Sequence, residues 1–421
     1  MRGLALTVVE TLKALIYRTA ICGTFSIINR QTSLTLRATI IWHSNMAKLK
    51  DQNINQAKLS KAAYSLFDFS KKEKPFLIII CILVSIAGYI TQYTYAAMWF
   101  GFILAAYSAI ANDSIQTIGT FIASNSKTKW YWLWLFMGLI FVGTVLYSWI
   151  THNGDVSYER LQVRGLDQAP DEIVFLQLAA PIVLLVMTRL RMPVSTTFLL
   201  LNVFTYEAGT IVGVMEKSFI GYLLAFFMGI IVWFVLERFV PNYLKGKPGP
   251  YWMPIQWLIS GSLWAVWIMQ DAANIAVFLP RNLQLGEFVA FAGFVFFGLG
   301  FLFYLKGDRI QDIVNKKTRV TDVRAATIVD FVYAIILFYF KMHSKMPMST
   351  TWVFIGLLGG REIAIALAKS KKLKKRKARL VRAYRQTWND VSKALLGLII
   401  SLILALIIND GVRKELWALL F

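Results

Sequence analysis

The chain is poor in charged residues, histidine and cysteine. Only 16% of its 421 residues are charged, against about 25% in an ordinary soluble domain. Three histidines are too few and too scattered for a catalytic or zinc site, and Cys22 and Cys81 can form at most one disulfide. The glycine-containing segment 246–250, "GKPGP", lacks the spacing of a phosphate-binding P-loop, which argues against pumping driven by ATP.

Apolar residues take the place of the missing charge and make up 57% of the chain. Several apolar runs are long enough to cross roughly 30 Å of hydrocarbon, among them 76–100, 130–150 and 394–408. Lipid cannot satisfy backbone hydrogen-bonding groups, so such runs must be helical. The sequence therefore predicts a multi-pass protein with roughly ten transmembrane or half-spanning helices, in contact with the lipid bilayer.

The net charge of +22 does not indicate nucleic-acid binding, because the basic residues lie between apolar runs. The densest block, 369–385, holds ten Lys and Arg residues. Such an excess is typical of cytoplasmic segments that touch anionic lipid, so we predict a basic cytoplasmic loop over 369–386. The loops 237–250 and 306–324 should then face the same side, and the acid-rich loop 151–172 the other.

The N-terminal segment 1–74 stands apart. Its first 50 residues contain seven Lys or Arg and one acidic residue, which resembles an organellar presequence. The alternative is a start site assigned too far upstream, since the sequence from Met46 reads like an ordinary cytosolic amino terminus. We favour the second interpretation, and so expect the cell (inner) membrane rather than an organellar one.

Two polar motifs each occur twice. "RMPVSTTF" at 191–198 is matched by "KMPMSTTW" at 345–352, and "ANDSIQTIGT" at 111–120 by "MQDAANIAVF" at 269–278. The two aspartates are 158 residues apart and the two serines 154, as an internal duplication requires. Matched, polar interruptions of apolar segments are typical of transporters built from repeats.

These patterns define the expected organisation. We predict an all-α integral membrane protein in two inverted repeats with discontinuous helices. The first repeat should cover 75–240 and the second 241–410, followed by a C-terminal tail over 411–421.

The aspartate motifs lie within apolar runs, where a charge is costly and is by default a functional hypothesis. Asp113 and Asp271 each have amide side chains within one helical turn. Carboxylate and amide oxygens form a hard ligand shell that suits Na⁺, or a protonation site, and not a soft metal. The alternative is a carboxylate held in helix packing by amide hydrogen bonds. The predicted cation-binding residues are Asn112, Asp113, Gln116, Gln270, Asp271 and Asn274, with Na⁺ at the two aspartates.

The Ser-Thr-Thr motifs read as helix starts within the membrane, because Pro favours the first turn and Ser and Thr are good caps. Free N–H groups, hydroxyls and the helix dipole form an anion site there. The alternative is hydroxyls that bond back to carbonyls or tighten helix contacts. The predicted substrate-binding residues are Asp113, Asp271, Ser195, Thr196, Thr197, Ser349, Thr350 and Thr351. For four other charged residues the sequence leaves three roles open: a gate, a proton or cation relay, or a residue at a helix end. They are Asp330, Glu207, Arg361 and Glu362.

The motif pairs resemble those of the inorganic phosphate transporter family called PiT, whose two inverted halves each carry a Gly-x-Asn-Asp-type and a Pro-x-Ser-Thr-Thr motif. The resemblance covers about 75–410. It implies a secondary transporter that moves phosphate with Na⁺ or H⁺ and binds it at mid-membrane between the halves. The chain departs from the family at Phe198 and Trp352, where the family has His. It also has Gln116 and Gln270 where the family has Asn, and Ala111 and Met269 where it has Gly.

The leading hypothesis is thus a phosphate symporter without a cofactor other than its coupling ion, Na⁺ or H⁺. Sulfate or another oxyanion is an alternative substrate, and a non-transporting anion sensor or scaffold is an alternative of another class. An intramembrane aspartic protease would leave the hydroxyl motifs without a role, so we do not expect an enzyme. The oligomeric state stays open, a homodimer included.

Overall fold

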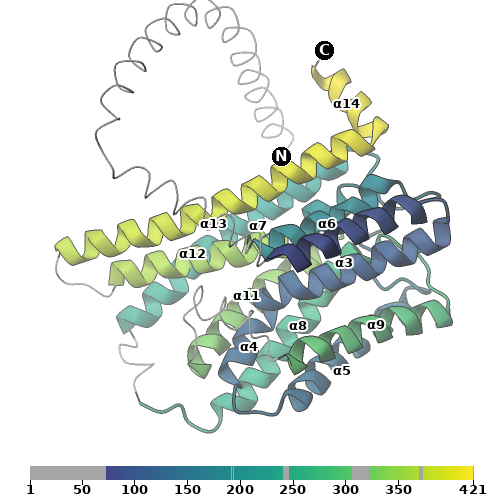
Figure 1. Ribbon diagram of the computed structural model, residues 1–421. Coiled ribbons are helices and arrows are strands. Elements are labelled where there is room, and N and C mark those ends of the chain that lie inside the picture. The colour runs from purple at the N-terminus through teal and green to yellow at the C-terminus, as the bar shows by residue number, and fades with distance from the viewer. Residues whose placement is uncertain are drawn as a thin grey trace, which may run out of the picture. The chain divides into compact units, whose positions relative to one another are not determined.

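The computed structural model describes residues 73–420 except 191, 193, 240–245, 306–321 and 369–372. Throughout these residues every regular element is a helix, which confirms the predicted all-α class (Figure 1). After a helix over Glu73–Ile90, the elements are α3 (Thr94–Thr117), α4 (Gly119–Ser124), α5 (Trp130–Thr151), α6 (Phe175–Arg189), the short π-helix η2 (Thr197–Leu201), α7 (Ala208–Phe239), α8 (Trp252–Ala276), α9 (Leu285–Tyr304), α11 (Val323–His343), α12 (Thr350–Ala368), α13 (Leu373–Ile408) and α14 (Asp410–Leu420).

The chain divides into two compact units, one of 82–417 and one of 1–81 with 418–421. The first unit contains both copies of each motif. In the second, only 73–81 and 418–420 are described. Most of the N-terminal segment 1–74, including both interpretations of its first 50 residues, therefore lies outside the described residues.

Among the described residues, eight helices are long and apolar enough to cross a membrane. Helix α6 is apolar but shorter, and α8 is long enough but carries the polar side chains of the second aspartate motif. Large apolar side chains lie exposed on the outside of the helices, for example Leu139, Phe297 and Phe331. Such a surface is unfavourable in water and expected in lipid. The protein is a multi-pass membrane protein.

Helices α3 and α8, which carry the two aspartate motifs, run antiparallel. Near the start of α3, a Cβ on Gly101 would lie 2.3 Å from the ring of Phe278, just beyond the end of α8. Beyond the other end of α3, Asn125 Nδ2 donates to Gln256 Oε1 in the first turns of α8, at 2.9 Å. The start of α3 therefore lies near the end of α8, and the end of α3 lies near the start of α8.

Helices α5 and α9 are related in the same way. Trp149 Nε1, near the end of α5, donates to the carbonyl of Leu283 just before α9, at 2.8 Å. At the other end, the rings of Trp130 and Tyr304 are 5.3 Å apart. Since α5 follows the first aspartate motif and α9 the second, equivalent helices are again antiparallel.

Helix α12 packs closely along α7 (Figure 1). A Cβ on Gly360 would lie 2.0 Å from the carbonyl oxygen of Phe226, and one on Gly356 would lie 2.4 Å from that of Tyr222. Small residues four apart allow this backbone approach in membrane helices. The contact fixes α12, whose first residue, Thr350, belongs to the second Ser-Thr-Thr motif.

Two segments differ from expectation. The predicted basic loop 369–386 is helical from Leu373 onwards, since α13 has 36 residues and starts there. Lys, Arg, Ala and Leu are good helix formers, and a membrane span needs only about 20 residues, so the basic stretch extends the helix. The predicted tail 411–421 forms α14, whose first turn carries Asp410, a favourable charge at a helix start.

Candidate functional site

The two aspartates and the two Ser-Thr-Thr segments come together in the interior of the 82–417 unit. Asp113 lies near the end of α3 with 1% of its surface exposed, and Asp271 lies on α8 with 3%. All six Ser and Thr residues of the repeated motif are buried as well. Helices begin at both motifs: α12 begins at Thr350, and the five-residue π-helix η2 begins at Thr197.

Asp271 is surrounded by hydrogen-bond donors from both copies of the motif. Its Oδ1 accepts from Thr197 Oγ1 at 3.2 Å and from Asn274 Nδ2 at 2.5 Å. Its Oδ2 accepts from Thr350 Oγ1 at 2.5 Å. One carboxylate thus joins η2, α8 and the start of α12.

Asp113 is only partly satisfied. Its Oδ1 accepts from Asn112 Nδ2 at 2.9 Å and from Gln116 Nε2 at 3.2 Å. Its Oδ2 is buried and has no hydrogen-bond partner. A buried acceptor without a partner is costly and calls for a ligand or a proton.

The amide of each aspartate motif reaches the hydroxyl motif of the other copy. Gln116 Nε2 donates to Thr351 Oγ1 at 3.0 Å, and Asn274 Nδ2 donates to Thr197 Oγ1 at 3.2 Å. Gln116 and Asn274 occupy corresponding positions, because they are 158 residues apart, as the two aspartates are. Thr197 and Thr351 also correspond, because they are 154 residues apart, as the two serines are. These two bonds are therefore equivalent.

The third residue of each Ser-Thr-Thr segment also holds the backbone of the other segment. Thr197 Oγ1 donates to the carbonyl of Met348 at 3.0 Å, and Thr351 Oγ1 donates to that of Val194 at 3.3 Å. Val194 and Met348 are again 154 residues apart. We call these two the crossed bonds, because each ties one copy of the motif to the other.

The two serines have a local role in this conformation. Ser195 Oγ accepts from the N–H of Phe198 at 3.1 Å, and Ser349 Oγ accepts from the N–H of Trp352 at 3.3 Å. Both are caps that satisfy a free N–H at a helix start. An accepting hydroxyl still has a proton to donate, so each serine can cap its helix and donate to a ligand.

Four buried side-chain oxygens of the aspartate motifs have no hydrogen-bond partner. They are one carboxylate oxygen and three amide oxygens, and oxygen ligands of this kind suit a hard cation. These atoms are Asp113 Oδ2, Gln116 Oε1, Gln270 Oε1 and Asn274 Oδ1.

A small cavity adjoins Asp271. It has a volume of about 30 Å³ and is lined by residues of α3, α5, α8 and α9, including Ala109, Phe141, Trp267 and Leu299. That volume holds one or two waters.

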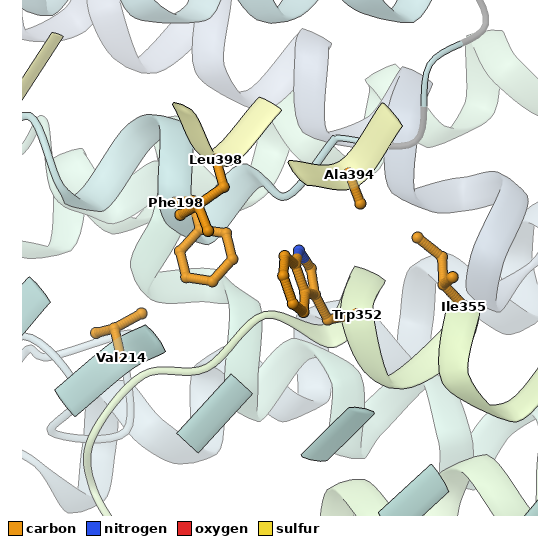
Figure 2. Close-up of a cluster of buried hydrophobic side chains, with 6 residues drawn as sticks. All are labelled: Phe198, Val214, Trp352, Ile355, Ala394 and Leu398. Atoms are coloured by element: carbon orange, nitrogen blue, oxygen red, sulfur yellow. The ribbon is translucent and has the colours of Figure 1, made fainter. Parts of the chain in front are cut away.

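Phe198 and Trp352 contact each other directly after their motifs. Their ring centroids are 5.7 Å apart with planes at 89°, an edge-to-face arrangement. Figure 2 shows the two rings side by side below α13, with Leu398 and Ala394 above them. The indole Nε1 of Trp352 is buried without a hydrogen-bond partner. The two residues form an apolar contact between the two copies of the Ser-Thr-Thr motif.

Sequence reasoning did not find two buried cations beside the site, Arg160 and Lys217. Lys217 interrupts the apolar run of α7, a signal that could have singled it out. Arg160 lies in the segment expected to face outwards, with no signal of burial, yet only 1% of its surface is exposed.

Two of the four charges left open have buried roles. Asp330, on α11, accepts from Thr120 Oγ1 at 2.8 Å and from Ser260 Oγ at 2.6 Å, so it holds α4, α8 and α11 together. Arg361 pairs with its neighbour Glu362 at 2.9 Å and lies over the ring of Trp233.

Glu207 has an outer role. It pairs with Arg164 at 2.7 Å, just before α7 begins. Because 86% of the Arg164 side chain is exposed, this pair contributes little to stability.

No protein-family model, curated protein or solved structure matches the chain in the comparisons made.

Proposed function

We propose that the protein is a secondary active transporter that carries inorganic phosphate together with Na⁺ or H⁺ by alternating access. The observation that carries the proposal is the pair of buried aspartate motifs joined to two copies of a hydroxyl motif through equivalent bonds. Intramembrane carboxylates are expensive, and a matched pair of them supports a transport site.

The antiparallel relation of equivalent helices supports two inverted repeats. Helix α3 is the counterpart of α8, and α5 is the counterpart of α9. A chain whose second half repeats the first with opposite direction in the membrane gives this pattern. The site then lies between the halves, where movement of one half against the other opens it to alternate sides.

The coupling cation would bind at the unpartnered oxygens. Asp113 Oδ2 and Gln116 Oε1 offer a carboxylate and an amide oxygen within one helical turn. A bound Na⁺ or proton neutralises the carboxylate and so permits an anion to approach. The affinity of each ligand then depends on the other, which is the thermodynamic basis of symport.

Unpartnered amide oxygens of the same motifs favour phosphate over sulfate as the anion. Near neutral pH phosphate carries at least one P–OH donor, whereas sulfate offers only acceptors. Asn274 Oδ1 is a buried acceptor without a partner and can accept from such a donor, and the hydroxyls of Ser195 and Ser349, which cap their helices by accepting, can donate to the other oxygens.

Uptake into proteoliposomes tests the proposal. Labelled phosphate and labelled sulfate are offered separately under an imposed inward Na⁺ gradient, an imposed pH gradient, or neither. We expect gradient-driven phosphate uptake that exceeds sulfate uptake. The variant Glu207→Gln, which removes an outer carboxylate, serves as the matched control and should transport normally.

Three results would change the conclusion. Equal uptake of the two anions would replace phosphate specificity with general oxyanion transport. Anion binding without gradient-driven flux of either anion would support the sensor or scaffold. Absence of both binding and flux would overturn the proposal.

A further inference from the structure

Arg160 and Lys217 meet at the backbone of residues 344–346, directly before the second Ser-Thr-Thr segment. Arg160 Nη1 donates to the carbonyls of Ser344, Lys345 and Met346 at 3.4, 3.2 and 3.1 Å. Lys217 Nζ donates to the carbonyls of Ser344 and Met346 as well. Two cations from distant parts of the chain thus share the same two acceptors.

Arg160 also contacts the second aspartate motif. Its Nε donates to the carbonyl of Met269 at 2.8 Å, two residues before Asp271. The Asp271 carboxylate and the Arg160 guanidinium are close enough to interact electrostatically. The cation pair therefore borders the site without being part of the hydroxyl motifs.

The charge of this pair is offset through the electrostatic interaction of Arg160 with Asp271, and not through a direct ion pair. Among the residues that the structure describes, no carboxylate forms an ion pair with Arg160 or Lys217. The nearest acid in sequence, Glu159, pairs instead with the exposed Lys345 at 2.6 Å. Carbonyl groups satisfy hydrogen bonds but do not neutralise charge, and two buried like charges repel each other.

One donor of the pair has no partner. Arg160 Nη2 is buried and makes no hydrogen bond. Buried donors without a partner are rare in folded proteins and call for an explanation. An arginine fork with one free arm next to a lysine ammonium matches the oxygens of a tetrahedral dianion.

The two residues before Arg160 have a left-handed backbone conformation. Tyr158 and Glu159 both have positive φ, at 56° and 60°. Non-glycine residues in this region cost energy, and such strain collects at functional sites. Tyr158 is held by its hydroxyl, which donates to the carbonyl of Thr144 at 2.6 Å.

We propose that Arg160 and Lys217 form a second oxyanion position, which receives hydrogen phosphate or sulfate beside the Asp271 motif before it passes to the Ser-Thr-Thr segments. This inference rests on the proposed transport function. The cation pair supplies the positive charge that the hydroxyl motifs lack. The competing interpretation is a purely structural clamp on residues 344–346.

Anion-dependent thermal stability of the purified protein in detergent tests the inference without a transport assay. Melting temperature, followed by tryptophan fluorescence, is titrated with phosphate, with sulfate, and with chloride at equal ionic strength. We expect Arg160→Gln and Lys217→Gln each to weaken the apparent phosphate affinity roughly tenfold to a hundredfold. The control Lys345→Gln removes an exposed cation of the same segment and should change the affinity less than about twofold.

Charge-conserving variants separate binding from clamping. Arg160→Lys and Lys217→Arg keep the charge, so both should recover most of the phosphate affinity. Variants that melt at lower temperature without anion but keep the wild-type phosphate affinity would overturn the inference in favour of a clamp. A wild-type protein that binds neither anion would overturn the proposed transport function itself.

Discussion

The environments of Asp271 and Asp113 differ although their motifs are copies. Both oxygens of Asp271 accept hydrogen bonds, from Thr197, Asn274 and Thr350. Asp113 takes its strongest contacts from the two amides of its own helix and keeps one oxygen free. The two copies of the motif therefore differ in how far packing satisfies them: Asp271 links three elements, whereas Asp113 keeps one oxygen without a hydrogen-bond partner.

The variant Asp271→Asn should have the largest effect. The asparagine side chain has one acceptor oxygen in place of two, whereas three donors point at this position. At least one donor therefore loses its partner, at a cost of about 1–3 kcal/mol. We expect gradient-driven uptake to be lost and the melting temperature in detergent to fall. A variant as stable as the wild type would contradict the structural role of Asp271.

Asp113→Asn should abolish driven uptake with little loss of stability. The asparagine keeps Oδ1 as an acceptor, and the oxygen that it replaces makes no hydrogen bond. We expect the Na⁺- or proton-dependent shift in melting temperature to disappear, while the melting temperature without ligand changes by less than the equivalent of about 1 kcal/mol. If Asp271→Asn lost the ligand-dependent shift in melting temperature and Asp113→Asn kept it, Asp271 and not Asp113 would be the cation-binding aspartate.

Removal of one hydroxyl from each copy tests the same asymmetry on the donor side. The one hydroxyl proton of Thr197 lies within hydrogen-bonding distance of both Asp271 and the carbonyl of Met348, whereas Thr351 donates to the carbonyl of Val194. Thr197→Val should therefore reduce phosphate uptake several-fold more than Thr351→Val, as measured by initial rates. Equal losses in the two variants would indicate that the crossed bonds matter more than the link to Asp271.

The smallest effect is expected at the surface pair of Glu159 and Lys345. The hydrogen bond from Lys345 lowers the pKa of the Glu159 carboxyl. The stabilisation is thus present above the ordinary glutamate pKa and is lost as pH falls through the lowered value. Glu159→Gln should cost less than about 1 kcal/mol at neutral pH. Melting curves of the variant and wild type should converge in acid; a constant difference would contradict the pair's role.

The sequence was sufficient for the helical class and for the residues of the two repeated motifs that lie together in the structure. Apolar runs predict membrane helices, because length and composition decide that property. The repeated motifs singled out Asp113, Asp271 and the six hydroxyl residues, which the structure brings together. Periodicity alone could not predict which hydroxyl meets which carboxylate, since that depends on how α3 and α8 pack against each other.

Other features were hidden because they depend on tertiary context. Arg160 belongs to a segment of loop composition, and only its fold brings it under residues 344–346. The basic stretch after Leu373 reads as a loop by charge, although its residues favour helix. The first motif predicts a helix start, but not that the helix beginning there is the short π-helix η2.

The crossed bonds have a symmetry of their own. Exchange of the two motif copies converts the bond from Thr197 to Met348 into the bond from Thr351 to Val194. Contacts at the interface of a twofold symmetric dimer obey this rule, because each residue there meets the same surface on its partner. Within one chain, these two bonds therefore relate the motif copies as an isologous interface relates two subunits.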